Sequence, residues 1–346
     1  MAYTTINKST DYFNTKTYSG SGSAQNIVTG TFQPDLIWVK SRSNAVSHVL
    51  TDAVRGIGKQ IFSDTNVAET SWTNALTAFR SDGFTTDTGG ETGQSGRTYV
   101  AWNWKANGAG STNTAGSINS TVSVSATSGF SIVKYTGTGS DMTVGHGLNA
   151  VPKMIILKAL STGSDPWWVY HASLGNSAKL RFNETNASAT SADYIWNQTT
   201  PTSSVFSLDG ANNGSNANGN SFIAYCFAEK TGYSKFGSYT GNGNADGAFI
   251  YLGFKPAFVM VKKTSGTGNW YINDNKRDPY NRATHSLFPN LSNAENATGW
   301  FVDYVSNGFK IRDTGSEVNA SGSTYIYMAF AEAPLVGTNN VPATAR

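Results

Sequence analysis

The sequence predicts an all-β protein built from three tandem related antiparallel β-sandwich units of the jelly-roll type. The prediction rests on two blocks of sequence, each of which occurs three times in the same order and at nearly the same spacing. Asn-Gly and Asp-Gly pairs, which favour tight turns between short strands, are spread along the chain. A helical period of apolar residues is not evident, so we expect strands rather than helices.

One repeated block is a strand of alternating large side chains. Its copies are RTYVAWNWKA at Arg97–Ala106, NSFIAYCFAE at Asn220–Glu229 and STYIYMAFAE at Ser323–Glu332. Successive side chains in a strand point to opposite faces, so the large residues that end in Trp104, Phe227 and Phe330 share one face in each copy. Because the other face is also apolar, we expect these strands inside their sheets, with their large side chains in a packed core.

The other repeated block lies upstream and contains an aromatic residue, a proline and a lysine. We expect the aromatic residue to end one strand, the proline to stand at the start of the next, and the lysine to close that strand with its ammonium group in solvent. A glycine-containing turn follows the aromatic residue. The positions are Tyr18, Tyr135 and Tyr239; Pro34, Pro152 and Pro256; and Lys40, Lys158 and Lys262.

The two blocks divide the chain into segments. We predict a first β-sandwich unit with an N-terminal segment at residues 1–106, a second unit at 130–230 and a third at 231–334. Residues 107–129 are rich in Gly, Ser and Thr; we expect a flexible linker in their first half and a possible extra strand in their second half. Residues 335–346 form a C-terminal tail.

The composition fits several small aromatic cores. Charged residues make up 14% of the 346 residues, whereas the chain contains 18 Phe, 16 Tyr and 9 Trp, too many for a disordered protein. The net charge of +3 is too small, and Lys and Arg are too scattered, to predict nucleic-acid binding. We expect no secretory signal and no membrane span, and we expect the single cysteine, Cys226, in the core.

The sequence carries no recognisable catalytic or metal-binding motif, and we predict neither an enzyme nor a cofactor. None of the four histidines stands at metal-ligand spacing from another. Four aspartates of the third unit could converge in the fold, which the sequence leaves open, although structural roles are favoured. They are Asp274, Asp278, Asp303 and Asp313.

Tryptophans beside Asn-, Asp- and Thr-rich segments suggest a surface for sugar rings, which bind by stacking and hydrogen bonding. Trp168 and Trp270 recur between units, which favours positions in a sandwich core. Trp167 and Trp196 have no counterpart in the other units, and the sequence leaves surface and core positions open for them. The glycan-binding hypothesis places these two side chains on the surface.

Several long segments resemble a known family. INKSTDYFNTKTYSGSG, VGHGLNAVPKMIILK, GYSKFGSYTGNGNADGAFIYLGFKPAFVMVKK and YIYMAFAE are similar to repeat-containing virion proteins of marine tailed bacteriophages, cyanophages and pelagiphages among them. Such proteins are usually labelled tail-fibre or virion structural proteins. The similarity runs from about Tyr3 to Pro334 and brings no enzymatic residues with it.

The resemblance implies a non-enzymatic virion surface protein, made in the host cytoplasm and carried on the phage particle. Its expected role is that of a tail-fibre or receptor-binding component for host attachment that contacts host surface glycans. A capsid decoration or stabilising protein is the leading alternative, and a polysaccharide-degrading tailspike is a weaker one. The expected partners are other virion proteins and host cell-surface polysaccharide, without nucleic acid or membrane, and a homotrimer is possible.

Overall fold

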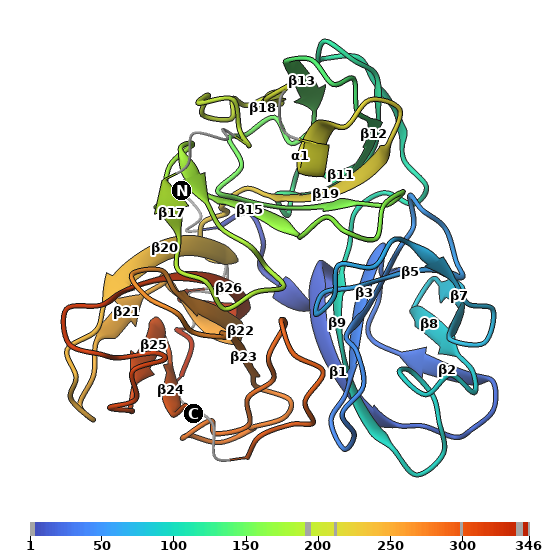
Figure 1. Ribbon diagram of the computed structural model, residues 1–346. Helices are drawn as coiled ribbons and strands as arrows, with labels where there is room; N and C mark the ends of the chain where they lie inside the picture. Colours follow the sequence, from blue (N-terminus) through green and yellow to red (C-terminus); the bar gives the residue numbers. More distant parts are fainter. Residues whose placement is uncertain (1–3, 191–194, 211–212, 298–299, 337–341, 345–346) are drawn as a thin grey trace.

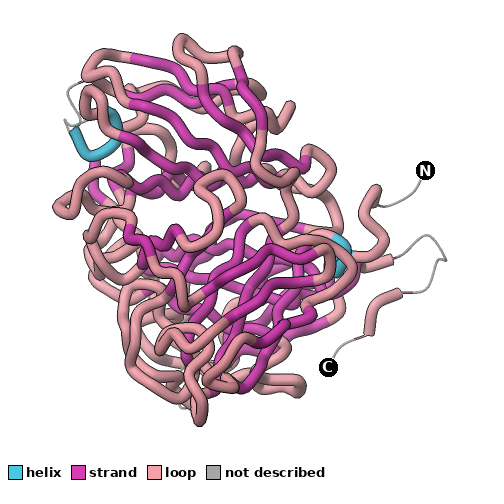
Figure 2. Tube along the Cα trace, turned by 90° about the vertical axis from the view of Figure 1, so that its right-hand side faces the viewer, coloured by secondary structure: helices cyan, strands magenta, loops and turns pink. Residues whose placement is uncertain are grey.

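The protein is almost entirely built from antiparallel β-strands, which confirms the predicted fold class. In the computed structural model, helical turns within the described residues are limited to a 3₁₀ turn, η1 (Ser9–Asp11), and a short helix, α1 (Asn213–Asn216) (Figure 2). Neither has the length and hydropathy needed to cross a membrane. The structure describes residues 4–190, 195–210, 213–297, 300–336 and 342–344.

Three larger sheets form the body of the molecule, and each is named here after its central strand. The β9 sheet has the order β1 (Phe13–Ser19), β9 (Thr98–Trp104), β3 (Leu36–Ser41), β4 (Val49–Asp52), β5 (Lys59–Phe62), β6 (Thr70–Ser71). The β19 sheet has the order β10 (Ser111–Asn113), β11 (Ser120–Ser125), β12 (Phe130–Thr136), β19 (Ser221–Phe227), β14 (Met154–Ala159), β15 (Trp168–His171). The β26 sheet has the order β20 (Ser234–Thr240), β26 (Thr324–Pro334), β22 (Phe254–Lys263), β23 (Trp270–Asp274).

Smaller sheets accompany the larger ones. They are β2 (Gln25–Val28), β8 (Gly83–Thr86) and β7 (Leu76–Arg80); β13 (Met142–Gly145) and β18 (Val205–Leu208); and β21 (Phe249–Tyr251), β25 (Gly308–Ile311) and β24 (Val302–Val305). A separate hairpin pairs β16 (Ala178–Lys179) with β17 (Ala189–Thr190). Figure 1 shows three lobes around a common centre, with each larger sheet toward that centre and each smaller sheet toward the outside.

The three larger sheets share one aromatic core. Their central strands bring Trp104, Phe227 and Phe330 together, with exposed fractions of 1%, 2% and 1%. Ring centroids lie 6.3 Å apart for Trp104 and Phe227, 5.7 Å for Trp104 and Phe330, and 6.1 Å for Phe227 and Phe330. Phe13 of β1 stacks on Phe330 at 5.0 Å and closes the cluster on one side. The predicted large-residue face is therefore the common centre of the molecule.

The other face of each central strand packs against the smaller sheet beside it. Here an aromatic residue of the neighbouring strand stacks on an aromatic residue of the central strand, and its hydroxyl donates to a backbone carbonyl in the segment that precedes the central strand. The stacked pairs are Tyr18 on Tyr99, Tyr135 on Phe222 and Tyr239 on Tyr325, and the acceptors are Thr92, Ser215 and Val318. The predicted tyrosines thus lie in strands and fasten the loop before each central strand.

The three prolines precede or interrupt a strand. Pro34 and Pro152 stand just before β3 and β14, as predicted. Pro256 instead lies inside β22, where the pairing with β26 shifts register on both of its sides. A proline within a strand fits such an irregularity because it has no N–H to give to the ladder.

Residues 107–129 are more ordered than a flexible linker. Their first half forms β10, which pairs with β11, so the linker expectation is wrong for that part of the chain. Their second half forms β11, which pairs with β12 as the predicted extra strand. Of the predicted tail at 335–346, residues 337–341 and 345–346 lie outside the described residues.

The order of four antiparallel strands recurs in the three larger sheets. It reads β1–β9–β3–β4, β12–β19–β14–β15 and β20–β26–β22–β23, in each case with the repeated central strand between its two upstream neighbours. The division into three tandem units stays a prediction, and this recurrence is the structural feature that supports it.

Replacing Phe330 with Ala should open a cavity in the shared core and lower the free energy of unfolding by about 3–5 kcal/mol. The measurement is chemical denaturation. Val28→Ala is the control, because Val28 is 51% exposed and its loss should change stability by less than about 0.5 kcal/mol. An unfolding midpoint for Phe330→Ala equal to that of the parent would contradict the assignment of this ring to the core.

Candidate functional site

The two tryptophans proposed for glycan stacking are buried, so that part of the hypothesis is wrong. Trp167 is fully buried and its Nε1 donates to the carbonyls of Phe62 and Thr65 at 3.0 and 3.2 Å. Trp196 is 1% exposed and packs edge-on against Tyr170. Neither ring can meet a sugar, because Trp167 fills the boundary with the β9 sheet and Trp196 fills the core of the β19 sandwich. Trp168 and Trp270 lie in cores, as expected; their exposed fractions are 4% and 1%. They do not match each other, however: the backbone N–H of Trp167 donates to Asn183 as that of Trp270 donates to Asn290, so the counterpart of Trp270 is Trp167.

The three repeated lysines are also buried, contrary to the expectation of solvated ammonium groups. Each Nζ donates to two backbone carbonyls. Lys158 reaches Asn66 in the loop after β5 at 3.1 Å, and Lys262 reaches Thr185 in the loop after β16 at 3.1 Å. These two lysines therefore fasten a loop from the preceding part of the chain, and their burial lowers their pKa to about 8, as it does for Lys40.

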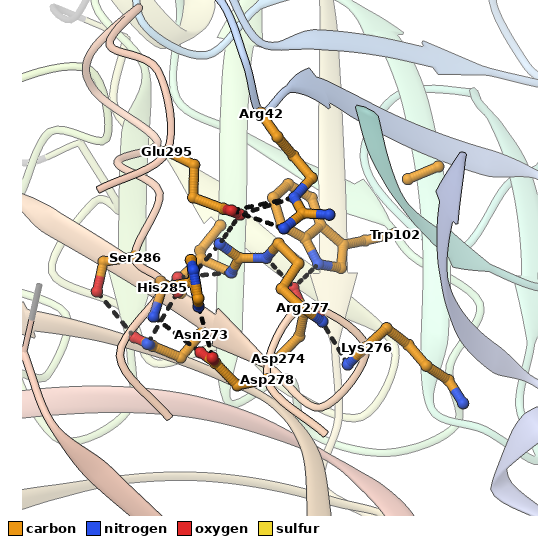
Figure 3. Close-up of polar contacts among 12 residues, drawn as sticks. Arg42, Trp102, Asn273, Asp274, Lys276, Arg277, Asp278, His285, Ser286 and Glu295 are labelled. Atoms are coloured by element: carbon orange, nitrogen blue, oxygen red, sulfur yellow. Dashed lines mark hydrogen bonds and ion pairs between the residues drawn. The ribbon is translucent and has the colours of Figure 1, made fainter. Parts of the chain in front are cut away.

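A polar network fills the boundary between the β9 and β26 sheets (Figure 3). Asp274, at the end of β23, accepts from Arg277 Nε at 2.6 Å and from Trp102 Nε1 of β9 at 3.1 Å. Glu295 accepts from Arg277 Nη1 at 3.0 Å and from Arg42 Nη2, just after β3, at 2.7 Å. The two arginines hold the pKa of Glu295 below its usual value despite burial. Every charge in this network therefore has an opposite charge beside it.

Matching positions make related contacts at the other two boundaries. Asp52 ends β4 as Asp274 ends β23, and it accepts from Tyr225 of β19 at 2.8 Å and from Arg55 at 2.5 Å. His171 ends β15, and its Nε2 lies 3.2 Å from the carbonyl oxygen of Tyr327 in β26. Burial lowers the pKa of His171 to about 4, so this imidazole is neutral near pH 7. Each pair of larger sheets is thus joined by a buried polar contact.

The acidic groups of the third lobe take part in hydrogen bonds and ion pairs within the protein. Asp278 is bound to His285 Nδ1 at 2.5 Å, but the neighbouring Ser286 hydroxyl is directed to Asn273. Asp303 pairs with Arg312, and Asp313 accepts from the backbone of Gly315. Within the described ranges, no group of three or more His, Cys, Asp or Glu side chains could hold a metal ion.

The most exposed pair of aromatic neighbours lies on β21. Phe249 and Tyr251 are 48% and 50% exposed, whereas Ile250 between them is 6% exposed and points inward. Residues two apart in a strand share a face, so both rings lie on the outer face of the β21–β25–β24 sheet. Gly308 stands opposite Tyr251 in β25 and adds no side chain to that face. The ring of Phe249 lies over Gly308, where an added Cβ would meet its Cε2 atom at 3.1 Å.

Charged side chains border these rings. Lys235 Nζ lies 5.3 Å from the centroid of the Tyr251 ring, and Lys310 stands opposite Phe249 in β25. Lys310 Nζ pairs with Asp246 at 2.9 Å, and that carboxylate is 71% exposed. We call Phe249, Tyr251, Lys235 and Lys310 the β21 surface. It offers aromatic faces, ammonium donors and a nearby carboxylate acceptor in one place.

The same positions in the other smaller sheets carry no aromatic residue. Tyr251 pairs with Gly308, the first residue of β25, and Val28 pairs with Gly83, the first residue of β8. Val28 therefore matches Tyr251. Two residues earlier in each strand, Asn26 matches Phe249. The matching positions of β13 are Thr143 and Gly145. The two exposed rings are therefore not required by the fold. The sequence signal for these rings is the alternation in AFIYLG, which contains no tryptophan.

Stability should increase with pH just above neutrality because of the buried lysines. Their pKa is about 8 in the fold and 10.5 when unperturbed, so above pH 8 the unfolded chain binds more protons and raising the pH favours the fold. Urea unfolding at about pH 7 and about pH 9 should show a gain that is smaller by about 1 kcal/mol in Lys158→Met than in the parent. Equal gains in both proteins would show that Lys158 has an ordinary pKa.

Removing the shared arginine of the Figure 3 network should be costly. Arg277→Leu leaves Asp274 and Glu295 buried with fewer partners, which should lower the free energy of unfolding by about 3–5 kcal/mol. Arg80→Leu is the control, because the Arg80–Asp82 pair is 38% and 39% exposed and should contribute less than about 1 kcal/mol. Denaturant curves in which both variants lose the same small amount would contradict the role given to Arg277.

Comparison with known proteins identifies a family but no function. No curated protein matches the sequence. The family DUF7483, described as a domain of unknown function, matches residues 8–334, which include all three larger sheets and the β21 surface. Because this match spans nearly the whole chain, the protein belongs to the DUF7483 family.

Proposed function

We propose that the protein is a non-enzymatic surface component of a phage particle, a tail-fibre or receptor-binding protein that contacts host glycans. The proposal combines the sequence resemblance to phage virion proteins with one structural observation, the exposed aromatic pair of the β21 surface. Its partners would be host polysaccharide on that face and other virion proteins elsewhere.

The β21 surface carries this proposal because its chemistry suits a sugar. Phe249 and Tyr251 present large ring faces to solvent, and aromatic rings that are half exposed commonly mark binding sites. Lys235 and Lys310 can donate hydrogen bonds to hydroxyl or carboxylate oxygens, while Asp246 can accept from a hydroxyl. Two cations beside one carboxylate favour a glycan with acidic groups over a neutral one.

The packing supports a binding role in place of catalysis. β21 is the edge strand of its sheet, and the rings stand on a sandwich whose interior is filled by residues such as Ile250 and Phe309. A rigid support lowers the entropy lost when a ligand binds. Weak single sites of this kind gain strength when many copies act together on one particle.

A capsid decoration or stabilising protein is the second candidate, and one observation favours it. Three sheets with matching strand order surround a common centre, an arrangement that would fit a threefold position on a symmetric particle (Figure 1). Labelling of intact particles with antibody against this chain would separate the two: an adhesin is expected on the tail, and a decoration protein over the head.

The double variant Phe249→Ala/Tyr251→Ala should lose binding to host cells and to purified host polysaccharide while keeping its fold. Removing two stacking rings should weaken binding at least about tenfold. Val28→Ala is the matched control, because Val28 occupies the position of Tyr251 in the first smaller sheet and is 51% exposed. Surface plasmon resonance on immobilised polysaccharide gives the affinities, and circular dichroism verifies folding. Unchanged binding by the double variant, or no binding by the parent, would refute the role of this surface.

A further inference from the structure

A second feature of the third lobe is a pocket between the start of β23 and the loop that precedes β26. Its volume is about 190 Å³, enough for one small molecule. The rings of Tyr271, Phe288 and Trp300 form one part of the lining, and the carboxylates of Asp313 and Glu317 form another. The pocket is separate from the β21 surface, with which it shares no residue.

The three rings form a rigid corner. Tyr271 and Phe288 lie 5.0 Å apart at 70°, and Tyr271 and Trp300 lie 6.3 Å apart at 67°. Their exposed fractions are only 8%, 8% and 3%, so packing holds the rings in place. Aromatic walls that meet at steep angles suit a compact cation, because the negative face of each ring attracts positive charge.

The carboxylates add negative charge at this corner. Glu317 Oε2 accepts from the backbone N–H of Asn269 at 3.1 Å, and Asp313 Oδ1 accepts from that of Gly315 at 2.6 Å. Among the described residues, neither carboxylate forms an ion pair with Lys or Arg. Lys262 is close enough for its charge to act on Glu317, but its Nζ is bound to two carbonyls. Burial and the charges of these two carboxylates raise the pKa of Tyr271, which also forms a side-chain hydrogen bond with Glu317, so the pocket is negatively charged.

The matching site in the β19 sheet holds a cation supplied by the protein. Equivalent backbone hydrogen bonds identify the matching positions. In the β19 sheet Val169 N donates to Leu180 O at 2.9 Å, and in the third lobe Ile272 N donates to Leu287 O at 2.8 Å. The residues after the two acceptors, Arg181 and Phe288, therefore match. There the Arg181 guanidinium carbon lies 5.2 Å from the centroid of the Trp168 ring. In the third lobe Phe288 replaces that arginine and Tyr271 replaces Trp168. The place that a protein cation takes in one lobe is thus lined by rings and carboxylates in the other.

Trp300 adds a second recognition element. Its indole N–H is buried and has no hydrogen-bond partner within the described protein. A buried donor without a partner is costly, and a ligand oxygen would remove that cost. The lining therefore favours a ligand that carries both a positive charge and an oxygen acceptor.

We propose that this pocket binds a small organic cation that also carries a hydroxyl, an amino alcohol or a protonated amino sugar. The ammonium group would lie against Tyr271, Phe288 and Trp300 with Glu317 and Asp313 beside it. The hydroxyl oxygen would accept from the indole N–H. This inference does not depend on the β21 surface or on the glycan-binding proposal.

Isothermal titration calorimetry with the full chain tests the charge requirement. Choline should bind with a dissociation constant of about 1 mM, and 3,3-dimethylbutan-1-ol, which has the same shape without the charge, should bind at least about tenfold more weakly. Tetramethylammonium, which lacks the hydroxyl, should bind more weakly than choline. Glucosamine as a fourth titrant distinguishes an amino alcohol from an amino sugar. Tighter binding of choline indicates an amino alcohol, and tighter binding of glucosamine indicates an amino sugar.

Glu317→Gln should weaken choline binding about tenfold while leaving the melting temperature unchanged, because the amide oxygen can still accept from Asn269. Glu91→Gln is the matched control. The hydroxyl of Tyr99 donates to Gly90 O at 2.9 Å, and the hydroxyl of the matching Tyr325 donates to Ser316 O at 2.8 Å. The residues that follow the two acceptors, Glu91 and Glu317, therefore occupy equivalent positions. Glu91→Gln removes the same charge from the first lobe and should bind choline like the parent.

Three outcomes would overturn the proposal. They are the absence of heat and of saturation-transfer NMR signals with choline at about 20 mM, equal binding of the uncharged analogue, and parent-like affinity of a folded Glu317→Gln variant. Equal binding of choline and tetramethylammonium would overturn the role given to the Trp300 N–H.

Discussion

The contact between Trp104, Phe227 and Phe330 is the constraint on which the rest of the molecule depends. Each ring belongs to the central strand of a different larger sheet, and the three ring centroids lie within 6.3 Å of one another. Hydrophobic attraction has no direction, so this cluster brings the sheets together without fixing their angles. It also orients each sandwich, because burying one face of a central strand leaves the other face for the smaller sheet outside it.

Hydrogen bonds at the boundaries between the larger sheets fix the angles that the aromatic cluster leaves open. Asp52, His171 and Asp274 end matching strands, and each contacts a different neighbouring sheet. A buried carboxylate or imidazole tolerates few positions of its partner, so these contacts select one arrangement among the many that would bury similar apolar area. The lysine ammonium groups act similarly on the loops that cross between lobes. The cost of burying them is visible in their lowered pKa.

The strand content could be predicted from the sequence because alternation and turn residues are local signals. The repeated central strands and the core position of Phe330 followed directly from them. The positions of Lys158 and Trp167 could not be predicted, since each hydrogen-bonds to a segment of the first lobe that is far away in the sequence. The same limit applies to the sites: Phe249 and Tyr251 were visible as a pattern, whereas Tyr271, Trp300 and Glu317 meet only after the third lobe has folded.

The unequal residues at matching positions have an evolutionary consequence. In an assembly of identical subunits, any substitution appears in every copy and must be tolerated by all of them. Here the matching positions lie in one chain and are encoded separately. Phe249 and Tyr251 occupy them in the third lobe; Asn26 and Val28 occupy them in the first, and Thr143 and Gly145 in the second. One face can therefore diversify under selection while its two counterparts remain unchanged and preserve the architecture.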